Sequence, residues 1–318
     1  MKPALFCQKT DIIFMGTPDF AAVTLKYMLK QGCRLSLVVT QPDRPKGRGR
    51  KLIAPPVKTA ALENGCEVAQ PVSIKNDAFI EQVRCLKPDY LIVTAYGQIL
   101  PQELLEIPRL GAINVHASLL PRYRGAAPIQ CAIINGEQET GVTTMFMDSG
   151  LDTGAMLLSK TEPILPDDTA ATLHDRLALI GAKLLFKTLE NHYAGEITPT
   201  PQDNNQATYA PLLKKKDGRI DWQKPAQQLV CQIRGMNPWP GAFTFYGDKR
   251  LKILAAQTAA METLANPGTV IQGFADELRI ATGDGALSIL EIQGASGKRM
   301  GIKAFLRGCK MPPGVVLG

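Results

Sequence analysis

Two side chains near the middle of the chain have types and spacing that suit acyl-group chemistry. Asn114 and His116 lie two residues apart in an apolar stretch that predicts a strand. Side chains alternate along a strand, so Asn114 and His116 project to one face, while Ile113 and Val115 project to the other, buried face. An amide can donate to an oxygen that gains negative charge, and an imidazole can donate to the same oxygen or move a proton.

A carboxylate further along the chain can complete this group. Asp152 lies in Ser149–Gly154, a Gly-containing segment that predicts a turn. Paired with the imidazole, the carboxylate would hold His116 in one orientation and favour its cation. An amine can attack a formyl carbonyl without a covalent intermediate, and no Ser or Cys stands in a nucleophile motif. Spacing alone leaves open a purely structural role, with His116 ending a strand and Asp152 forming a turn.

Composition limits the classes of protein to consider. The chain has 318 residues, 45% of them hydrophobic, which is enough for two domains with cores. No apolar run reaches the roughly 20 residues that cross a bilayer. The first residues lack the apolar core of a signal peptide, so we expect a cytoplasmic protein. Seven scattered cysteines without a Cys-x-x-Cys pair, and only three histidines, argue against a disulfide framework and against a metal site.

Positive charge gathers in two parts of the chain. The net charge is +7, and residues 215–318 hold 14 Lys and Arg against 8 Asp and Glu. Residues 41–58 hold six Lys or Arg and one acid, and their Gly and Pro content predicts an irregular loop that is poorly ordered without a partner. Two positive regions suggest a polyanion such as nucleic acid, with solubility alone as the alternative.

Strands and helices alternate in the first part of the chain. This order predicts a doubly wound α/β domain with a parallel sheet, in which ligands bind beyond the carboxyl ends of the strands, where Asn114 and His116 would lie. The expected strands are 11–15, 35–40, 90–94, 111–116, 142–147 and 156–160, and the expected helices are 21–30, 57–64, 77–85 and 169–191.

The pattern changes after a polar, Pro-rich stretch at residues 196–214, which predicts a linker. The predicted domains are therefore residues 1–195 and 215–318. The second domain should be a small OB-like β-barrel of about five strands. Its strand candidates are 242–246, 251–255, 269–271, 278–281 and 287–292.

Several motifs resemble the 10-formyltetrahydrofolate-dependent formyltransferases. The resemblance rests on Asn114–His116, on Ser118–Pro128 (Ser-Leu-Leu-Pro-Arg-Tyr-Arg-Gly-Ala-Ala-Pro) and on Gly150–Gly154. It runs from about residue 10 to the C-terminal region. Three further motifs narrow it to the branch of the family that acts on methionyl-tRNA: Gly16–Phe20, Gln41–Pro45 and Asn237–Gly241.

The resemblance implies a fold and a reaction. The fold is a Rossmann-like catalytic domain joined to a C-terminal OB-like barrel. The reaction moves the formyl group of 10-formyltetrahydrofolate to the α-amino group of methionine on initiator tRNA, for translation initiation and without a metal. The resemblance also implies three groups of site residues: catalytic Asn114, His116 and Asp152; folate-binding Ser118, Leu119, Leu120 and Pro121, with Tyr96–Leu100 as a further wall; and tRNA-binding Arg44, Lys46, Arg48, Arg50 and Lys51.

Other interpretations stay open at this point. The enzyme could formylate a small amine, such as an amino sugar nucleotide or glycinamide ribonucleotide, which would not require the basic segment. A non-catalytic RNA-binding protein on the same scaffold would be expected to lack the three catalytic residues, all of which are present. Arg122 and Arg124 could meet the folate tail, the tRNA 3′ end or structural carboxylates. We expect exposed imidazoles at His174 and His192, a packed turn around Trp239, and a monomer.

Overall fold

The computed structural model describes residues 4–46, 49, 51–261, 263–271, 276–294 and 297–318. Contacts divide the chain into two compact units, each made from several stretches. The first unit contains residues 1–125, 140–162 and 174–209, and the second contains residues 126–139, 163–173 and 210–318. The second unit reaches back to 126–139 because α6 (Pro128–Ile134) packs against α8 (Ala226–Gly235). The boundaries expected from sequence, 1–195, 196–214 and 215–318, stay a prediction.

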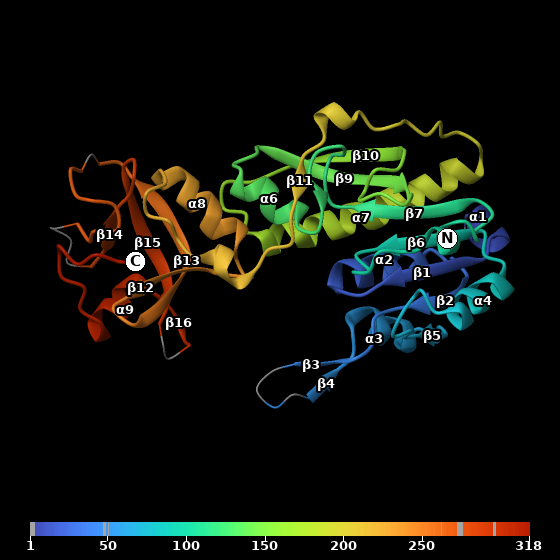
Figure 1. Ribbon diagram of the computed structural model, residues 1–318, viewed down its shortest axis with the longest axis horizontal. Helices are drawn as coiled ribbons and strands as arrows, with labels where there is room; N and C mark the ends of the chain where they lie inside the picture. The colour runs from blue at the N-terminus through green and yellow to red at the C-terminus, as the bar shows by residue number, and fades with distance from the viewer. Residues whose placement is uncertain (1–3, 47–48, 50, 262, 272–275, 295–296) are drawn as a thin grey trace. The chain divides into compact units, whose positions relative to one another are not determined.

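A seven-stranded sheet forms the centre of the first unit (Figure 1). Strands β1, β2, β5, β6 and β7 are parallel, and β9 runs antiparallel to β7. All residues of β1 and β6 are buried, as their continuous apolar sequences require in a sheet covered on both faces. In sheet order the strands are β10 (Met156–Pro163), β9 (Glu139–Phe146), β7 (Gly111–His116), β6 (Tyr90–Thr94), β1 (Ile12–Gly16), β2 (Leu35–Val39) and β5 (Val68–Ala69).

The order of these strands indicates where a ligand site is expected in the sheet. From β1 the chain first moves outward to β2 and β5, and it then crosses to β6 and β7 on the other side. The strand order therefore reverses between β1 and β6, and ligand sites of doubly wound sheets form beyond the carboxyl ends of the strands at such a point. Asn114 pairs in register with Val93 of β6, so Asn114 and His116 lie at this carboxyl edge.

Local sequence signals explain where the helices of the first unit begin and end. Residue 16, the last of β1, is a glycine because a Cβ there would lie only 2.6 Å from the Cβ of Ala21 in the helix that follows. The Asn76 side chain accepts hydrogen bonds from two backbone amides at the start of α4. The predicted helices are confirmed to within a few residues. The helices are α1 (Leu5–Lys9), α2 (Asp19–Lys30), α3 (Pro56–Glu63), α4 (Asp77–Leu86), α5 (Gln102–Leu105) and α7 (Ala170–Tyr193), of which α1 and α5 were not expected.

The second unit is built on an antiparallel five-stranded sheet. Its strands are β12 (Ala242–Tyr246), β13 (Lys249–Ala259), β14 (Leu278–Ala281), β15 (Ala286–Gln293) and β16 (Arg299–Gly301), and α9 (Ile302–Gly308) follows them. Leu229 of α8 packs in one core with Ile253, Ile280 and Leu287 of the sheet. The predicted fold class, a parallel-sheet α/β domain followed by a smaller domain of antiparallel strands, is confirmed. Helices α6, α8 and α9 and strand β16 were not expected.

Residues 269–271 are not a strand. Thr269 and Val270 make only isolated bridges, to Val316 and Ile280. The predicted linker is not free of structure either. It contains η1 (Asn204–Gln206), β11 (Tyr209–Ala210) begins near its end, and η2 (Lys215–Gly218) follows it. Thr200 exchanges two backbone hydrogen bonds with Met156, and the Thr208 carbonyl accepts from the amide of Arg124, in the two-residue strand β8 (Arg124–Gly125).

The basic segment differs from the expected irregular loop. Residues Arg44–Lys46 (β3) and Lys51–Ile53 (β4) form an antiparallel hairpin in which Pro45 lies opposite Leu52. Proline is tolerated because each strand of a two-stranded sheet is an edge, where a missing backbone donor costs little. The expectation of an irregular loop was therefore wrong for these two strands. Arg48 and Arg50 lie outside the described residues.

Two of the seven cysteines are paired. Buried Cys7 of α1 and Cys33, just after α2, form a disulfide, while the other five cysteines are free. The sequence argued against a disulfide framework, and it gave no sign of this single pair because the two cysteines are 26 positions apart and meet only through the packing of α1. Among the described residues, no helix is long and apolar enough to span a membrane.

Candidate active site

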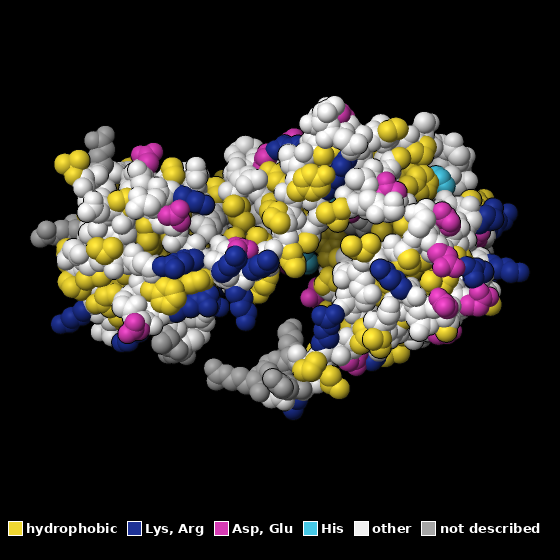
Figure 2. All heavy atoms as spheres, in the orientation of Figure 1, with side chains coloured by type: hydrophobic (Ala, Val, Ile, Leu, Met, Phe, Trp, Pro, Cys, Tyr) yellow, Lys and Arg dark blue, Asp and Glu magenta, His cyan; other side chains and the backbone are white. Residues whose placement is uncertain are grey.

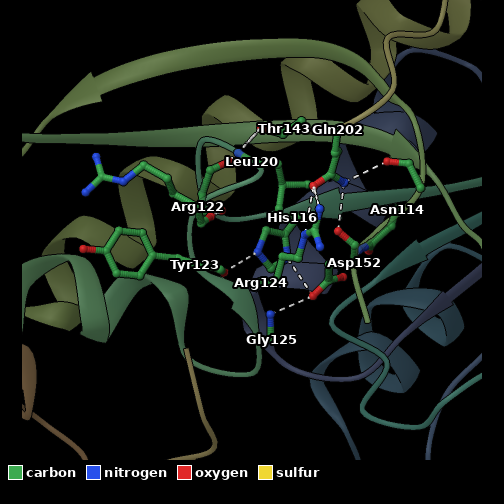
Figure 3. Close-up of polar contacts among 12 residues, drawn as sticks. Asn114, His116, Leu120, Arg122, Tyr123, Arg124, Gly125, Thr143, Asp152 and Gln202 are labelled. Carbon is green, nitrogen blue, oxygen red and sulfur yellow. Dashed lines mark hydrogen bonds and ion pairs between the residues drawn. The ribbon is translucent and has the colours of Figure 1, made fainter. Parts of the chain in front are cut away.

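The three predicted catalytic side chains come together at the carboxyl end of β7 (Figure 3). Asn114 Nδ2 donates to Oδ1 of Asp152 over 3.3 Å, and His116 Nδ1 lies 3.5 Å from Oδ2. Asn114 and His116 are buried, with 9% and 6% of their surfaces exposed. Burial strengthens the electrostatic interactions among an amide, an imidazole and a carboxylate, so this group can polarise a carbonyl and manage a proton.

The turn after β9 is shaped to present Asp152. The backbone of Asp152 has φ +53°, in the left-handed region that non-glycine residues avoid. Gly154 must be glycine, since a Cβ there would lie 1.9 Å from the Phe146 carbonyl oxygen. The Asp148 carboxylate closes the turn by accepting from the Gly150 amide and the Thr153 hydroxyl. The backbone amide of Gly125 donates to Asp152 Oδ2 over 2.9 Å, which fixes the carboxylate itself.

The hydrogen bonds of His116 assign one of its protons. Nε2 lies 2.9 Å from the Tyr123 carbonyl oxygen, which can only accept, so Nε2 carries a hydrogen. Nδ1 faces Asp152. The imidazole is thus held from both sides, between the end of the Ser118–Tyr123 segment and the Asp152 turn. Nδ1 is therefore the nitrogen left to interact with the Asp152 carboxylate.

The predicted folate segment, Ser118–Pro121, is fixed by internal hydrogen bonds. The buried Ser118 hydroxyl donates to the Arg122 carbonyl over 2.6 Å. Thr143 of β9 donates to the Ser118 carbonyl and accepts from the Leu120 amide. The Ser118 side chain therefore shapes this turn, and Thr143 is a support that the sequence did not reveal.

Two polar residues surround the Asp152 turn: Gln202, which the sequence did not reveal, and Arg124, whose partners were left open. Gln202 Nε2 donates to the backbone carbonyls of both Asp152 and Gly154 over 2.8 Å. Arg124 donates to Gln202 Oε1 through Nε and an Nη atom over 3.0 and 2.8 Å, and to Asn204 Oδ1. The Arg124 side chain is almost fully buried, and its partners are amide oxygens rather than the carboxylates considered above. The exposed Arg122 guanidinium lies 5.4 Å from the centre of the Tyr123 ring.

The basic hairpin is joined to the sheet through Gln41. This buried amide donates to the Tyr96 carbonyl over 2.8 Å and accepts from the Arg44 guanidinium. At the base of the hairpin, hydrogen bonds from Lys58 and Gln70 hold the pKa of the Asp43 carboxyl below its usual range. Beyond this base, Arg44, Lys51 and Leu52 are exposed. The structure does not describe the Lys46 side chain, and it does not describe Arg48 or Arg50.

The expected wall segment Tyr96–Leu100 follows β6 at the same edge. Tyr96 is buried, and this burial raises its pKa to about 12. Gly97 has φ +85°, and a Cβ there would lie 2.7 Å from Gln41 Nε2, so the glycine permits the contact that holds the hairpin. Ile99 is exposed. In the part of the chain that the structure describes, no cluster of three His, Cys, Asp or Glu side chains could hold a metal ion.

The remaining candidate residues serve structural roles. His192 and His174 are half-buried rather than exposed, and His192 Nδ1 lies 2.8 Å from the hydroxyl of Tyr90. Burial lowers the pKa of His192 and raises that of Tyr90. In the second unit, Trp222 is buried and donates to Thr244, whereas Trp239 is about half exposed, so its turn is less packed than expected.

Known proteins place the chain in a family. The sequence model of the family described as Formyl transferase matches residues 9–189, and that of its C-terminal domain matches residues 212–310. The chain is 51% identical over 307 residues to the methionyl-tRNA formyltransferase of Citrifermentans bemidjiense, covering 96% of each chain. It is 52% identical over 308 residues to the protein of the same name from Pelobacter propionicus, covering 97% of this chain and 96% of the relative.

A solved structure shares the fold. The N-formyltransferase from Helicobacter canadensis, in complex with folinic acid and dTDP-3-aminofucose, superposes with a TM-score of 0.66 at 21% identity, covering 87% of this chain and 97% of that one. At this identity the likeness concerns the fold alone. The family match over more than half of the chain and the identity to its full-length relatives give one conclusion: the chain belongs to the formyl transferase family.

Proposed function

We propose that this protein transfers the formyl group of 10-formyltetrahydrofolate to the α-amino group of methionine on initiator methionyl-tRNA. The observation that carries the proposal is the identity of about one half to relatives named methionyl-tRNA formyltransferase, which extends over nearly the whole length of both chains. The geometry adds support, because Asn114, His116 and Asp152 form one connected group beyond the end of a central strand. The reaction belongs to translation initiation, in the cytoplasm.

Formyl transfer requires groups that stabilise charge and groups that move protons. The donor supplies a formyl carbonyl that the methionine amine attacks, so negative charge forms on oxygen while the attacking nitrogen loses a proton and the donor nitrogen leaves with one. Asn114 Nδ2 has two hydrogens, and only one of them is directed to Asp152 in the described structure, so the other can donate to the forming oxyanion. A cationic His116 would stabilise the same charge. To give a proton to the leaving nitrogen, its Nε2 would have to release the Tyr123 carbonyl, and the neutral imidazole could then take up the proton that the attacking nitrogen loses.

Asp152 would act through both partners. Its carboxylate accepts from Asn114 on one oxygen and faces the imidazole with the other. It would thereby aim the Asn114 amide and stabilise the His116 cation as charge develops, without a covalent intermediate.

The donor would be bound beside this group by Ser118, Leu119, Leu120 and Pro121. The residues fit a folate in two respects. Leu119 and Leu120 are apolar, and the segment that carries them is preformed by the hydrogen bonds of Thr143. A segment that is already ordered spares the entropy of ordering a loop on binding.

The tRNA would be held by the basic hairpin and by the second unit. Arg44 and Lys51 are exposed and could reach phosphates, and the sequence between them carries three more cations, Lys46, Arg48 and Arg50. Figure 2 shows Lys and Arg side chains gathered near β12 and β13 on the face drawn. Exposed cations of this region include Lys249 and Arg250, whose guanidinium stacks 3.6 Å from the centre of the Phe243 ring. We expect a monomer to suffice.

The test is a direct comparison of acceptors. The protein is incubated with 10-formyltetrahydrofolate and, in parallel, with initiator methionyl-tRNA, a dTDP-amino sugar or glycinamide ribonucleotide. Formylmethionine on the tRNA alone is expected. Formylation of a small amine without any on tRNA would overturn the proposal in favour of a small-molecule enzyme. Binding of tRNA without any transfer would favour a non-catalytic RNA-binding protein.

A further inference from the structure

The side-chain amide of Gln202 contacts the backbone of the Asp152 turn at two points. Gln202 Nε2 has two hydrogens, and they go to the carbonyls of Asp152 and Gly154, each at 2.8 Å (Figure 3). These carbonyls lie on either side of Thr153, so the amide joins the two ends of the turn's tightest part. A left-handed backbone at a non-glycine residue is strained and persists only where its surroundings hold it. Asp152 has such a backbone.

The orientation of the Gln202 amide is decided by its neighbours. Its Oε1 accepts two hydrogen bonds from Arg124, whose guanidinium has donors only, and its Nε2 faces two carbonyls, which only accept. A rotation of the amide by half a turn would place donor against donor and acceptor against acceptor. The buried guanidinium of Arg124 therefore fixes which end of Gln202 meets the turn.

These contacts form a relay that ends at the catalytic carboxylate. Arg124 orients Gln202, Gln202 holds the backbone of Asp152, and the carboxylate of Asp152 then meets Asn114, His116 and the Gly125 amide. Arg124 also belongs to the segment that returns to His116, since the carbonyl of the preceding residue, Tyr123, lies against His116 Nε2. The relay thus ties together the two segments that enclose the imidazole.

We propose that Gln202, oriented by Arg124, is a positioning residue that holds the Asp152 turn in its reactive conformation, a role that rests on the proposed formyl transfer. Gln202 acts on the backbone of Asp152, so it contributes to the rate without contacting either substrate. A displacement of a catalytic group by about 1 Å can lower a rate by about 100-fold. The loss of the two hydrogen bonds from Gln202 should therefore appear in kcat rather than in KM.

Gln202→Glu tests this role while keeping the shape of the side chain. A carboxylate still accepts from Arg124, and the charge of Arg124 favours it. The carboxylate cannot donate to the carbonyls of Asp152 and Gly154, so the two hydrogen bonds are replaced by a repulsion between acceptors. Gln206→Glu is the matched control, because exposed Gln206 lies four residues away and donates only to Asp203 among the described residues.

We expect Gln202→Glu to lower kcat about 10- to 100-fold, with KM for methionyl-tRNA and for the donor within about threefold of the wild type. The melting temperature should stay near that of the wild type because Arg124 keeps a partner. Gln206→Glu should match the wild type throughout. A wild-type kcat for Gln202→Glu would overturn the proposal, as would a loss of activity that follows a loss of folded protein.

A double-variant comparison tests whether Gln202 acts through Asp152. In an Asp152→Asn background, the additional Gln202→Glu substitution should change kcat by less than about threefold, because the group that it positions is already disabled. An unreduced effect of 10-fold or more in that background would show that Gln202 acts elsewhere and would overturn the relay.

One readout does not depend on the identity of the substrates. The Gly125 amide is bonded to Asp152 Oδ2, so its hydrogen exchange, followed by NMR, reports whether the carboxylate stays in place. Exchange at Gly125 should be faster in Gln202→Glu and unchanged in Gln206→Glu, even if the proposed acceptor is wrong. Unchanged protection in Gln202→Glu would contradict the positioning role without bearing on the choice of acceptor.

Discussion

The Asp152 turn and the Arg44–Ile53 hairpin are two short segments beyond the same carboxyl edge of the sheet, and they are built in opposite ways. The Asp152 carboxylate is bonded to Asn114 and to the Gly125 amide, and the backbone behind it is held by Gln202. The hairpin is tied to the rest of the unit mainly at its base, where Gln41 donates to the Tyr96 carbonyl and Lys58 of α3 donates to Asp43, and the described side chains of its strands are exposed. Chemistry needs atoms fixed to a fraction of an ångström, whereas phosphate recognition needs charge, reach and an adaptable backbone.

The largest expected effect comes from substitutions in the group around the Asp152 turn. Asp152→Ala and His116→Ala should each lower kcat by about 10²- to 10⁴-fold, the range expected for the loss of a general acid or base, while the Kd for methionyl-tRNA stays nearly unchanged. Single-turnover formylation and filter binding measure the two quantities. Asp167→Ala, which removes an exposed acid, is the control. Wild-type turnover in both variants would mean that these residues are wrongly assigned.

A substitution in the hairpin should change KM for the tRNA rather than kcat. Arg44→Ala should raise KM for methionyl-tRNA about tenfold through the loss of one charged hydrogen bond, with kcat at saturating tRNA almost unchanged. Loss of one phosphate contact should also reduce the slope of log Kd against log salt by about one. Exposed Arg34, which lies before β2 at the opposite edge of the sheet, is the control for the loss of one positive charge. An equal loss of donor hydrolysis in Arg44→Ala would argue against an RNA role.

Gln41 tests whether the two regions are independent. It joins Arg44 of the hairpin to the carbonyl of Tyr96, in the segment expected to wall the donor pocket. Gln41→Ala should therefore raise KM for both the donor and the tRNA by about two- to tenfold, as expected for the loss of a hydrogen bond. Steady-state kinetics with each substrate varied in turn would measure this. A change confined to tRNA would place Gln41 with the hairpin alone.

The smallest expected effect concerns stability and lies outside both regions. Burial lowers the pKa of His192, so as pH falls through about 6.5 the unfolded chain takes up a proton before the folded protein does. The unfolded state then binds more protons, and the free energy of unfolding decreases with falling pH. Thermal unfolding between pH 7.5 and 5.5 should show a smaller decrease for His192→Gln than for the wild type. Equal decreases would exclude His192 as a source of acid sensitivity.

The sequence predicted those parts of the molecule that depend on local signals. The alternation of Ile113–His116 placed two polar side chains on one face of a strand, and the glycines around Asp152 indicated its turn. Gln202 could not be found in the same way, because its partners lie 48 to 78 residues away and its own segment is a polar, Pro-rich stretch typical of a linker. Pro45 and the neighbouring glycines hid the hairpin, and the Cys7–Cys33 pairing depends on packing.

The division of work between the two regions is tested most directly by single-turnover formylation of initiator methionyl-tRNA at increasing tRNA concentration, for the wild type, Asp152→Asn and Arg44→Ala. The account predicts that Arg44→Ala recovers a nearly wild-type maximal rate once tRNA is saturating. It also predicts that Asp152→Asn saturates at a wild-type tRNA concentration but with a maximal rate lower by about 100-fold or more. A slow maximal rate in Arg44→Ala, or a normal one in Asp152→Asn, would contradict it.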